Sequence, residues 1–221
     1  MLMRDRRRAL MMFTSRVPAG FRELDYIESD GNAYILTSIA PGSREVRFRG
    51  KWYKSTQASA EQALFALAYG TTENAVELGF SATANRVFLY SKASSSSGNS
   101  AMITNAAVYN NWVDFIATVT DGSPKKSFEV TAGGNTLSAT ATTDNSPNLE
   151  TSTLALFTGR VRDQNCPGKM GELIMEIGSG FSTVAAHLIP VERLSDNIKG
   201  YYETISGAFY PSDGSSDFSG G

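Results

Sequence analysis

The sequence predicts an all-β domain built as a two-sheet antiparallel sandwich, and three observations support this class. The composition is rich in glycine, serine, threonine, alanine and asparagine, and charged residues make up only 19% of the chain. Turn-forming residues recur at short intervals, and no segment shows a long run of apolar residues at helical spacing. A length of 221 residues suits one sizeable domain, because two domains would each have a small core.

The first twenty residues differ from the rest of the chain. Residues 1–16 carry five arginines and one aspartate, whereas the whole chain has a net charge of −2. Residues 17–20, Val-Pro-Ala-Gly, interrupt any continuing helix and are typical of a linker. We therefore divide the chain into a basic arm and linker over residues 1–20 and a folded domain over residues 21–221. The arm is either a disordered or briefly helical tail or a segment that docks into a larger assembly, and its candidate docking residues are Arg4, Arg6, Arg7 and Arg8.

Two β-rich runs open the folded domain. They are residues 24–28 (LDYIE) and 33–39 (AYILTSI), and residues 29–32 (SDGN) separate them. Asp30 and Gly31 supply the positive φ angles of a tight turn between antiparallel strands. The pattern therefore predicts a β-hairpin at the start of the domain.

The next strand is predicted over residues 45–54 (EVRFRGKWYK), where apolar and polar side chains alternate. Val46, Phe48 and Trp52 fall on the face expected to be buried. The outward face is basic, and it is either a solvated strand face or a surface for an acidic neighbour or an anionic glycan. Its candidate binding residues are Arg47, Arg49, Lys51 and Tyr53.

Further strands follow along the rest of the chain, separated by Asp-Gly, Gly-Gly and related turns. Residues 93–100 (ASSSSGNS) are predicted to be a low-complexity loop. The continuously apolar run near residue 65 leads into glycine, which favours a strand over a short helix. The predicted strands lie within residues 64–70, 76–82, 86–92, 111–122, 127–134, 136–143, 153–159, 171–180, 185–193 and 200–211.

Four segments together resemble the concanavalin A-like, laminin-G-like jelly-roll domains found in phage tail and virion proteins and in surface proteins of gut bacteria. The opening segment VPAGFRELDYIESDGNAYILTSI, the central NWVDFIATVTDG, and LALFTGRVRDQNCPGKMGELIMEI are similar to parts of that group. The closing segment LIPVERLSDNIKGYYETISGAFY carries its Ile-Pro-x-x-Arg-x-Ser-Asp pattern. The resemblance implies two antiparallel sheets packed face to face, with the first and last strands close in space. Val191 and Glu192 stand where relatives often carry cysteine or arginine, so a generic ligand site cannot be assumed.

A glucanase is the enzymatic alternative, because Glu23, Asp25 and Glu28 follow the E-x-D-x-x-E spacing of laminarinase-like and lichenase-like jelly rolls. In those families Glu23 would match the nucleophile and Glu28 the acid/base, which must lie about 5–5.5 Å apart in a retaining mechanism. On a regular strand, however, Glu28 lies on the face opposite Glu23. Only a β-bulge near Tyr26 or Ile27 would bring the two together, so we predict structural acids and no enzymatic activity.

Three single residues are predicted to have structural roles. His187 is the only histidine, and alternation places it opposite Leu188 as a structural residue. Cys166 is the only cysteine, so no intrachain disulfide forms. The surrounding segment NCPGK predicts a loop that carries a thiol without a catalytic signature. Trp112 is predicted to be a core aromatic under the sheet.

Composition also limits the expected ligands. Four aspartates in predicted loops are scattered singly, which predicts no metal site and no cofactor: Asp30, Asp121, Asp144 and Asp163. The basic residues of the arm give weak support for nucleic acid, so none is expected as a partner. No run approaches the ~20 apolar residues of a membrane span, and "ALMMF" is too short for a secretory signal.

The sequence thus predicts a non-enzymatic structural or adhesion module, with a phage virion as its expected location. Expected partners are other virion subunits or further copies of the chain, contacted through the arm, and host surface glycans. The alternative is a carbohydrate-binding protein on a bacterial surface.

Overall fold

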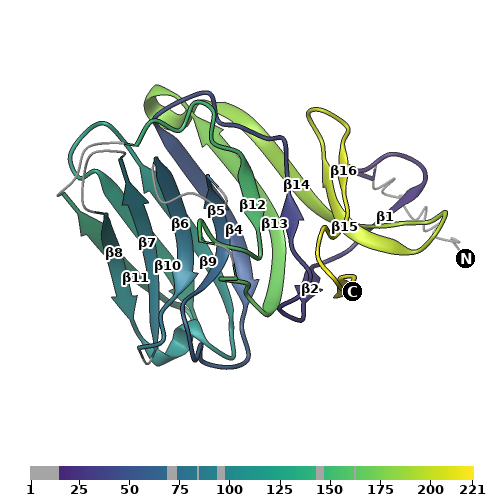
Figure 1. Cartoon of the computed structure of the whole chain (residues 1–221), viewed down its shortest axis with the longest axis horizontal. Coiled ribbons are helices and arrows are strands. Elements are labelled where there is room, and N and C mark those ends of the chain that lie inside the picture. The colour runs from purple at the N-terminus through teal and green to yellow at the C-terminus, as the bar shows by residue number, and fades with distance from the viewer. Residues whose placement is uncertain (1–14, 69–73, 84, 94–97, 143–146, 162) are drawn as a thin grey trace, which may run out of the picture.

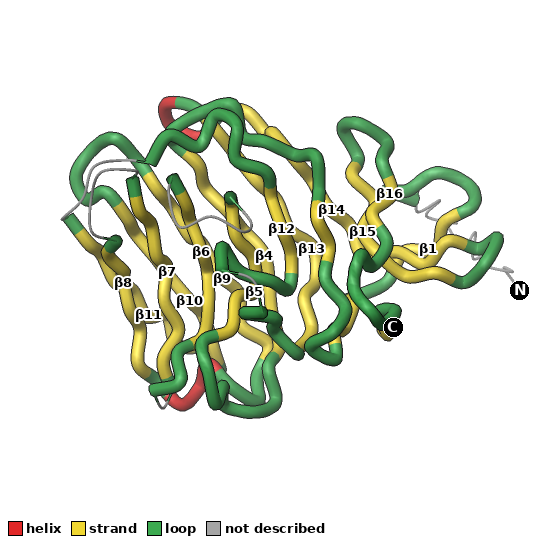
Figure 2. Tube along the Cα trace, in the orientation of Figure 1, coloured by secondary structure: helices red, strands yellow, loops and turns green. Residues whose placement is uncertain are grey.

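The computed structural model describes residues 15–68, 74–83, 85–93, 98–142, 147–161 and 163–221. Over these residues the chain forms two antiparallel β-sheets that stack face to face (Figure 1). Two short 3₁₀ turns, Ala106–Val108 and Ser179–Phe181, are the only helical segments among them (Figure 2). The all-β sandwich predicted from the sequence is therefore confirmed.

The larger sheet, called here the large sheet, contains eleven strands within the described residues. Eight of them follow the order β11 (Asn135–Ala141), β10 (Lys126–Ala132), β9 (Trp112–Val119), β4 (Val46–Tyr53), β13 (Gly168–Ile177), β14 (Thr183–Arg193), β15 (Ile198–Glu203) and β16 (Phe209–Tyr210). Three short strands complete it, with β1 paired to β14, β2 paired to β13, and β17 paired to β2: β1 (Phe21–Glu23), β2 (Ile27–Ser29) and β17 (Ser219–Gly220).

The second sheet, called here the small sheet, contains six strands of the described chain. Its order is β3 (Ile35–Leu36), β12 (Leu154–Leu156), β5 (Gln62–Leu67), β6 (Ala75–Phe80), β7 (Arg86–Lys92) and β8 (Asn99–Thr104). Most of these strands lie where the sequence pattern predicts them. Strand β8 was not predicted, because its first residues belong to the serine-rich stretch assigned to a loop.

The core lies between the sheets and is built from the inward residues of both. Trp52 of β4 is completely buried and packs edge-on against Phe80 of β6, with ring centroids 5.7 Å apart. Its indole nitrogen donates a hydrogen bond to the carbonyl oxygen of Val108 at 3.3 Å, so the polar end of the ring is satisfied. Phe48 lies on the same face of β4, four residues before Trp52. Its ring contacts that of Phe65 of the small sheet, with centroids 4.4 Å apart. The predicted alternation in β4 is therefore confirmed.

Strand β14 extends beyond the sandwich and carries a small additional unit. Its first half pairs with β13, whereas its second half pairs with β15 and β1. Ile189 and Val191 in this second half form a separate apolar cluster with Val17. Val17 is only 5% exposed, so ordered packing begins in the segment before Phe21. The predicted domain boundary at residues 20–21 itself stays a prediction, and the docking arginines of the arm lie outside the described residues.

The hairpin predicted at Asp30-Gly31 is wrong. Strand β2 belongs to the large sheet and β3 to the small sheet, so the turn carries the chain from one sheet to the other. Gly31 does adopt a positive φ of 99°, and the Asp30 carboxylate accepts the backbone N–H groups of Asn32 and Ala33 at 2.7 and 3.1 Å. The Asn32 N–H, a hydrogen bond from the Ser216 hydroxyl at 2.8 Å and the Ala33 N–H together lower the pKa of Asp30 to about 2. The turn signal was real, but it does not specify which sheet the next strand joins.

The segment ELDYIE is likewise not one strand. Glu23 ends β1, which pairs with β14, while Glu28 lies in β2, which pairs with β13 and β17. The break falls at residues 24–26, and Asp25 donates its N–H to the carbonyl oxygen of Gly221. The first and last strands are therefore neighbours, as the resemblance implies.

Candidate functional site

A row of side chains crosses the outer face of the large sheet, on the side away from the core. Trp112 of β9 lies opposite Tyr53 of β4, and Tyr53 lies opposite Lys169 of β13. Lys169 in turn lies opposite Glu28 of β2. Directly opposed residues in an antiparallel pair project to the same face, so this row forms a continuous strip.

Three aromatic rings gather on this strip, and we call them the aromatic platform: Tyr26, Tyr53 and Trp112. The Trp112 ring lies 5.7 Å from that of Tyr26 and 5.9 Å from that of Tyr53, measured between centroids. Trp112 is 40% exposed, although indole is among the side chains with most to gain from burial. The prediction that Trp112 lies in the core is wrong, because β9 begins with it on the outward face.

Two lysines sit over the rings of the aromatic platform. The Lys51 ammonium lies 5.0 Å from the centroid of Trp112, and the Lys169 ammonium lies 4.4 Å from that of Tyr26. A cation over an aromatic face is attracted by the ring quadrupole, which holds both lysines close to the surface. The platform thus combines apolar ring faces with N–H donors at its margin.

A shallow depression of about 420 Å³ adjoins the aromatic platform. Its lining comes from β4, β9 and β13. The lining includes positively and negatively charged side chains, namely Arg49, Lys51, Asp114 and Glu172, together with Gly50 and Ile174.

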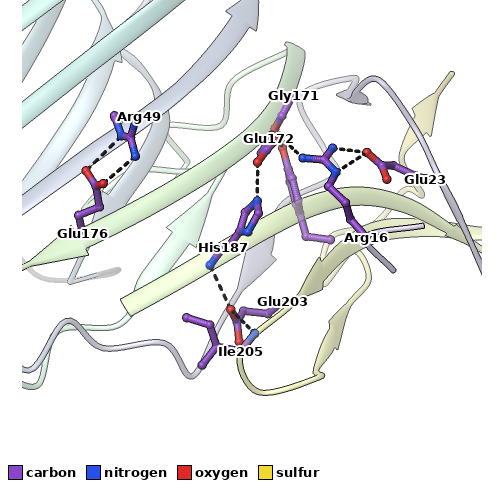
Figure 3. Close-up of polar contacts among 10 residues, drawn as sticks. Arg16, Glu23, Arg49, Gly171, Glu172, Glu176, His187, Glu203 and Ile205 are labelled. Atoms are coloured by element: carbon purple, nitrogen blue, oxygen red, sulfur yellow. Dashed lines mark hydrogen bonds and ion pairs between the residues drawn. The ribbon is translucent and has the colours of Figure 1, made fainter. Parts of the chain in front are cut away.

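The arginines of β4 are engaged by one carboxylate. Glu176 of β13 accepts hydrogen bonds from Arg47 at 2.5 Å and from Arg49 at 2.6 and 3.1 Å (Figure 3 shows the Arg49 pair). Burial would raise the pKa of Glu176, but these two guanidinium groups outweigh it, and the pKa lies below its ordinary value. Arg47 also lies 4.9 Å from the ring of Phe181.

A chain of polar contacts ties the N-terminal segment to this face (Figure 3). The Arg16 guanidinium donates hydrogen bonds to the carboxylates of Glu23 and Glu172. The Glu172 carboxylate also contacts the ring nitrogen Nε2 of His187. The His187 backbone N–H donates to Glu203 at 3.0 Å. Burial would raise the pKa of Glu172, but the Arg16 and His187 hydrogen bonds outweigh it, so the pKa is lowered. His187 has the structural surroundings predicted for it, and Leu188 beside it is fully buried.

The four predicted residues of β4 therefore divide into two pairs. Arg47 and Arg49 are held by Glu176, whereas Lys51 and Tyr53 belong to the aromatic platform or its margin. All four point outward, and their use in binding stays a prediction. Sequence reasoning missed Tyr26 and Lys169. The pairing of β13 with β4 brings Lys169 beside Tyr53, and the pairing of β2 with β13 brings Tyr26 beside Lys169.

Neither a reactive thiol nor a cluster of metal ligands adds a candidate site among the described residues. Cys166 lies in a loop but is 1% exposed, and burial raises the pKa of its thiol to about 11, so it is not poised as a nucleophile. No cluster of three or more histidine, cysteine, aspartate or glutamate side chains able to hold a metal occurs among the described residues. In the same part of the chain, no helix is long and apolar enough to cross a membrane.

Neither a family model nor a curated protein matches the sequence. Solved structures do match the fold. Tailspike protein 2 of Escherichia coli O157:H7 bacteriophage CAB120 aligns over 69% of this chain with a TM-score of 0.55 and 13% identity. Domains LG4-5 of the mouse laminin alpha1 chain align over 70% with a TM-score of 0.51 and 11% identity. A heptameric SAP-like pentraxin from Limulus polyphemus aligns over 70% with a TM-score of 0.50 and 10% identity.

The chain has the concanavalin A-like jelly-roll fold. The matched region spans 22% of the tailspike chain, 40% of the laminin chain and 76% of the pentraxin chain. At these identities the likeness concerns the fold, and function has to be argued from the site.

Proposed function

We propose that the chain is a non-enzymatic adhesion module of a phage particle that binds saccharides on the host surface through the outer face of the large sheet. The observation that carries the proposal is the aromatic platform, with Trp112 40% exposed beside Tyr53 and Tyr26. One face of a pyranose ring presents C–H groups that pack on aromatic rings, while its hydroxyl groups reach polar side chains at the margin. Lys51 and Lys169 stand at that margin.

The shape of the surface favours an extended ligand. The strip from Trp112 to Glu28 crosses four strands, and the depression of about 420 Å³ continues it along β4 and β13. An open strip of this kind admits a polysaccharide from the side, without requiring a free chain end. The tailspike with the same fold belongs to a particle of the kind proposed here, and assembly with other virion subunits or further copies would use the N-terminal arm.

The glucanase alternative has less support. Glu23 bonds Arg16, whereas Glu28 lies 3.8 Å from the Lys169 ammonium, on a different strand. A retaining glycosidase needs two carboxyl groups about 5–5.5 Å apart with different protonation states. Two acids held by separate cations on separate strands fit ion-pair roles better.

The test is binding of the purified chain to an array of bacterial O-antigen and capsular polysaccharides. For a polysaccharide that binds, we expect Trp112→Ala to weaken affinity by about tenfold or more, which is the usual effect of removing an aromatic anchor. The matched control is Ile116→Ala, because Ile116 lies on the same strand and face and is 38% exposed. Ile116→Ala should leave affinity unchanged.

Two results would contradict the proposal. One is the absence of binding across the array, and the other is equal affinity of the wild type and Trp112→Ala for every polysaccharide bound. Release of reducing sugar that disappears in Glu23→Gln would favour the glucanase instead.

A further inference from the structure

A second depression, of about 250 Å³, lies on the opposite side of the molecule, on the outer face of the small sheet. The register places Glu77 of β6 opposite Tyr90 of β7, and Tyr90 opposite Ser100 of β8. In the neighbouring row, Phe88 of β7 lies opposite Gly79. The lining that matters here consists of Glu61, Ser81, Arg86, Ser100, Met102 and Arg160.

A fully buried carboxylate contacts Arg160, which lines this depression. Glu77 is 0% exposed, and one of its oxygens accepts the backbone N–H of Arg160 at 3.0 Å. The Arg160 guanidinium lies 3.7 Å from the same oxygen and 4.2 Å from the ring centroid of Tyr90. Glycine at position 159 leaves room for this contact, because a Cβ there would lie 2.9 Å from the Glu77 carboxylate. Arg160 is therefore positioned by its backbone, its charge partner and a ring.

Three buried polar atoms in or next to this depression lack a hydrogen-bond partner. Among the described residues, the second carboxylate oxygen of Glu77 and the Nε atoms of Arg86 and Arg160 are buried and make no hydrogen bond. Buried polar groups are nearly always satisfied in folded proteins, because an unmade hydrogen bond costs free energy. Two of these atoms belong to Arg86 and Arg160, which line the depression, and they indicate a site that a polar ligand completes.

The charges around the depression indicate the ligand. Glu77 faces Arg160, and Glu61, which also lines the depression, accepts a hydrogen bond from Gln164 at 3.3 Å. Arg86 forms no ion pair with another described residue. A guanidinium group matches a planar carboxylate through two parallel N–H donors.

Met102 of β8, directly opposite the buried Phe88, is 51% exposed and supplies an apolar surface, and Ser81 and Ser100 supply hydroxyl groups. We propose that this depression binds one carboxylated sugar ring of the hexuronate type, with its carboxylate on Arg86 and its ring against Met102.

The test is calorimetric titration of the full chain with tetragalacturonate, compared with its methyl ester, which has the same rings without the charge. We expect the acid to bind and the ester to bind at least about tenfold more weakly, as the loss of a charged hydrogen bond predicts. Arg86→Gln should weaken the acid to the level of the ester. Arg86→Lys, which keeps the charge and loses the planar fork, should fall between the two.

The controls separate this site from the aromatic platform. Arg44→Gln removes an exposed arginine outside both depressions and should bind like the wild type. Trp112→Ala should also keep full affinity for the acid. Unchanged thermal melting of Arg86→Gln shows that the fold is intact.

The inference is overturned if the acid fails to bind, if acid and ester bind equally, or if Arg86→Gln binds like the wild type. Titration with the monosaccharide galacturonate distinguishes a site for one free sugar from a site for one residue of a chain. An affinity comparable to that of tetragalacturonate would assign the site to single rings.

Discussion

Glu176 on the large sheet and Glu77 on the small sheet are both buried, being 5% and 0% exposed, yet their pKa values move in opposite directions. Glu176 accepts three hydrogen bonds from two guanidinium groups that water still reaches. Glu77 accepts one hydrogen bond, from a backbone N–H, and its nearest cation lies 3.7 Å away. Burial raises the pKa of Glu77, and Arg160 offsets only part of that effect. Charged donors outweigh burial at Glu176 but not at Glu77, and this balance sets the direction of each pKa shift.

The largest expected effect comes from breaking the Glu77–Arg160 pair. Glu77→Ala leaves the largely buried Arg160 without its counter-charge, so we expect a loss of about 3–5 kcal/mol in the free energy of unfolding. Urea titration measures it. Glu77→Gln is the matched variant, because it removes the charge but keeps the volume and one acceptor, so its loss should approach that of Glu77→Ala. A much smaller loss in Glu77→Gln would mean that packing, and not charge, dominates this site.

Gly159→Ala tests the same contact from the backbone side. The added Cβ would lie 2.4 Å from the side-chain oxygen of Gln164 and 2.9 Å from Glu77, so neighbouring groups must shift. Overpacking of this kind costs about 1–3 kcal/mol. Gly133→Ala serves as a spatial control, since nothing lies within 4 Å of its Cβ, although its positive φ of 57° adds some strain. Thermal melting of the two variants should place Gly159→Ala lower.

Glu176→Gln probes the corresponding pair on the large sheet. Arg47 and Arg49 stay partly hydrated, with side chains 30% and 46% exposed, and they do not become buried unpaired charges. We therefore expect a loss of only about 1 kcal/mol at neutral pH. A loss as large as that of Glu77→Ala would remove the distinction between the two faces.

The smallest effect concerns pH, and its sign differs between the faces. The lowered pKa of Glu176 contributes stability above the unfolded pKa of about 4.5, and this contribution is lost as the pH falls through the folded pKa. The raised pKa of Glu77 acts the other way. Between its unfolded and folded pKa values the native state binds more protons, so stability falls as the pH rises.

Urea titrations at a series of pH values check these signs. Compared with the wild type, Glu176→Gln should lose less stability on acidification below pH 4.5, the unfolded value. Glu77→Gln should lose less on raising the pH above the same unfolded value. Identical pH profiles for the two variants would contradict the comparison.

The sequence pattern predicted the fold class and most strands because local alternation carries that information. In β4 the side chains of Phe48 and Arg49 fall on the predicted faces, and β7 has the predicted bounds. Alternation identifies two faces but does not say which is buried when both carry aromatic residues, so Trp112 was misplaced. Strand β6 is buried at every position, and its central Glu77 therefore gave no periodic signal.

The candidate sites depend on pairings between distant segments. Tyr26 joins Trp112 only because β2 lies beside β13, and the Asp30-Gly31 turn gives no local sign of that choice. Arg160 reaches Glu77 from a loop 83 residues further along the chain. Such contacts follow from topology, which a single sequence specifies only through all of its strands together.

Arg16 and Val17 also determine how the domain would bear mechanical load. Tension applied at Ser15 reaches the Arg16 ion pairs and the buried Val17 side chain before it reaches the backbone hydrogen bonds of β1. Arg16 distributes that tension over two carboxylates, Glu23 at the end of β1 and Glu172 on β13 in the middle of the large sheet. A pull on the N-terminal side is therefore transmitted directly into the large sheet, and the short strand β1 does not carry it alone.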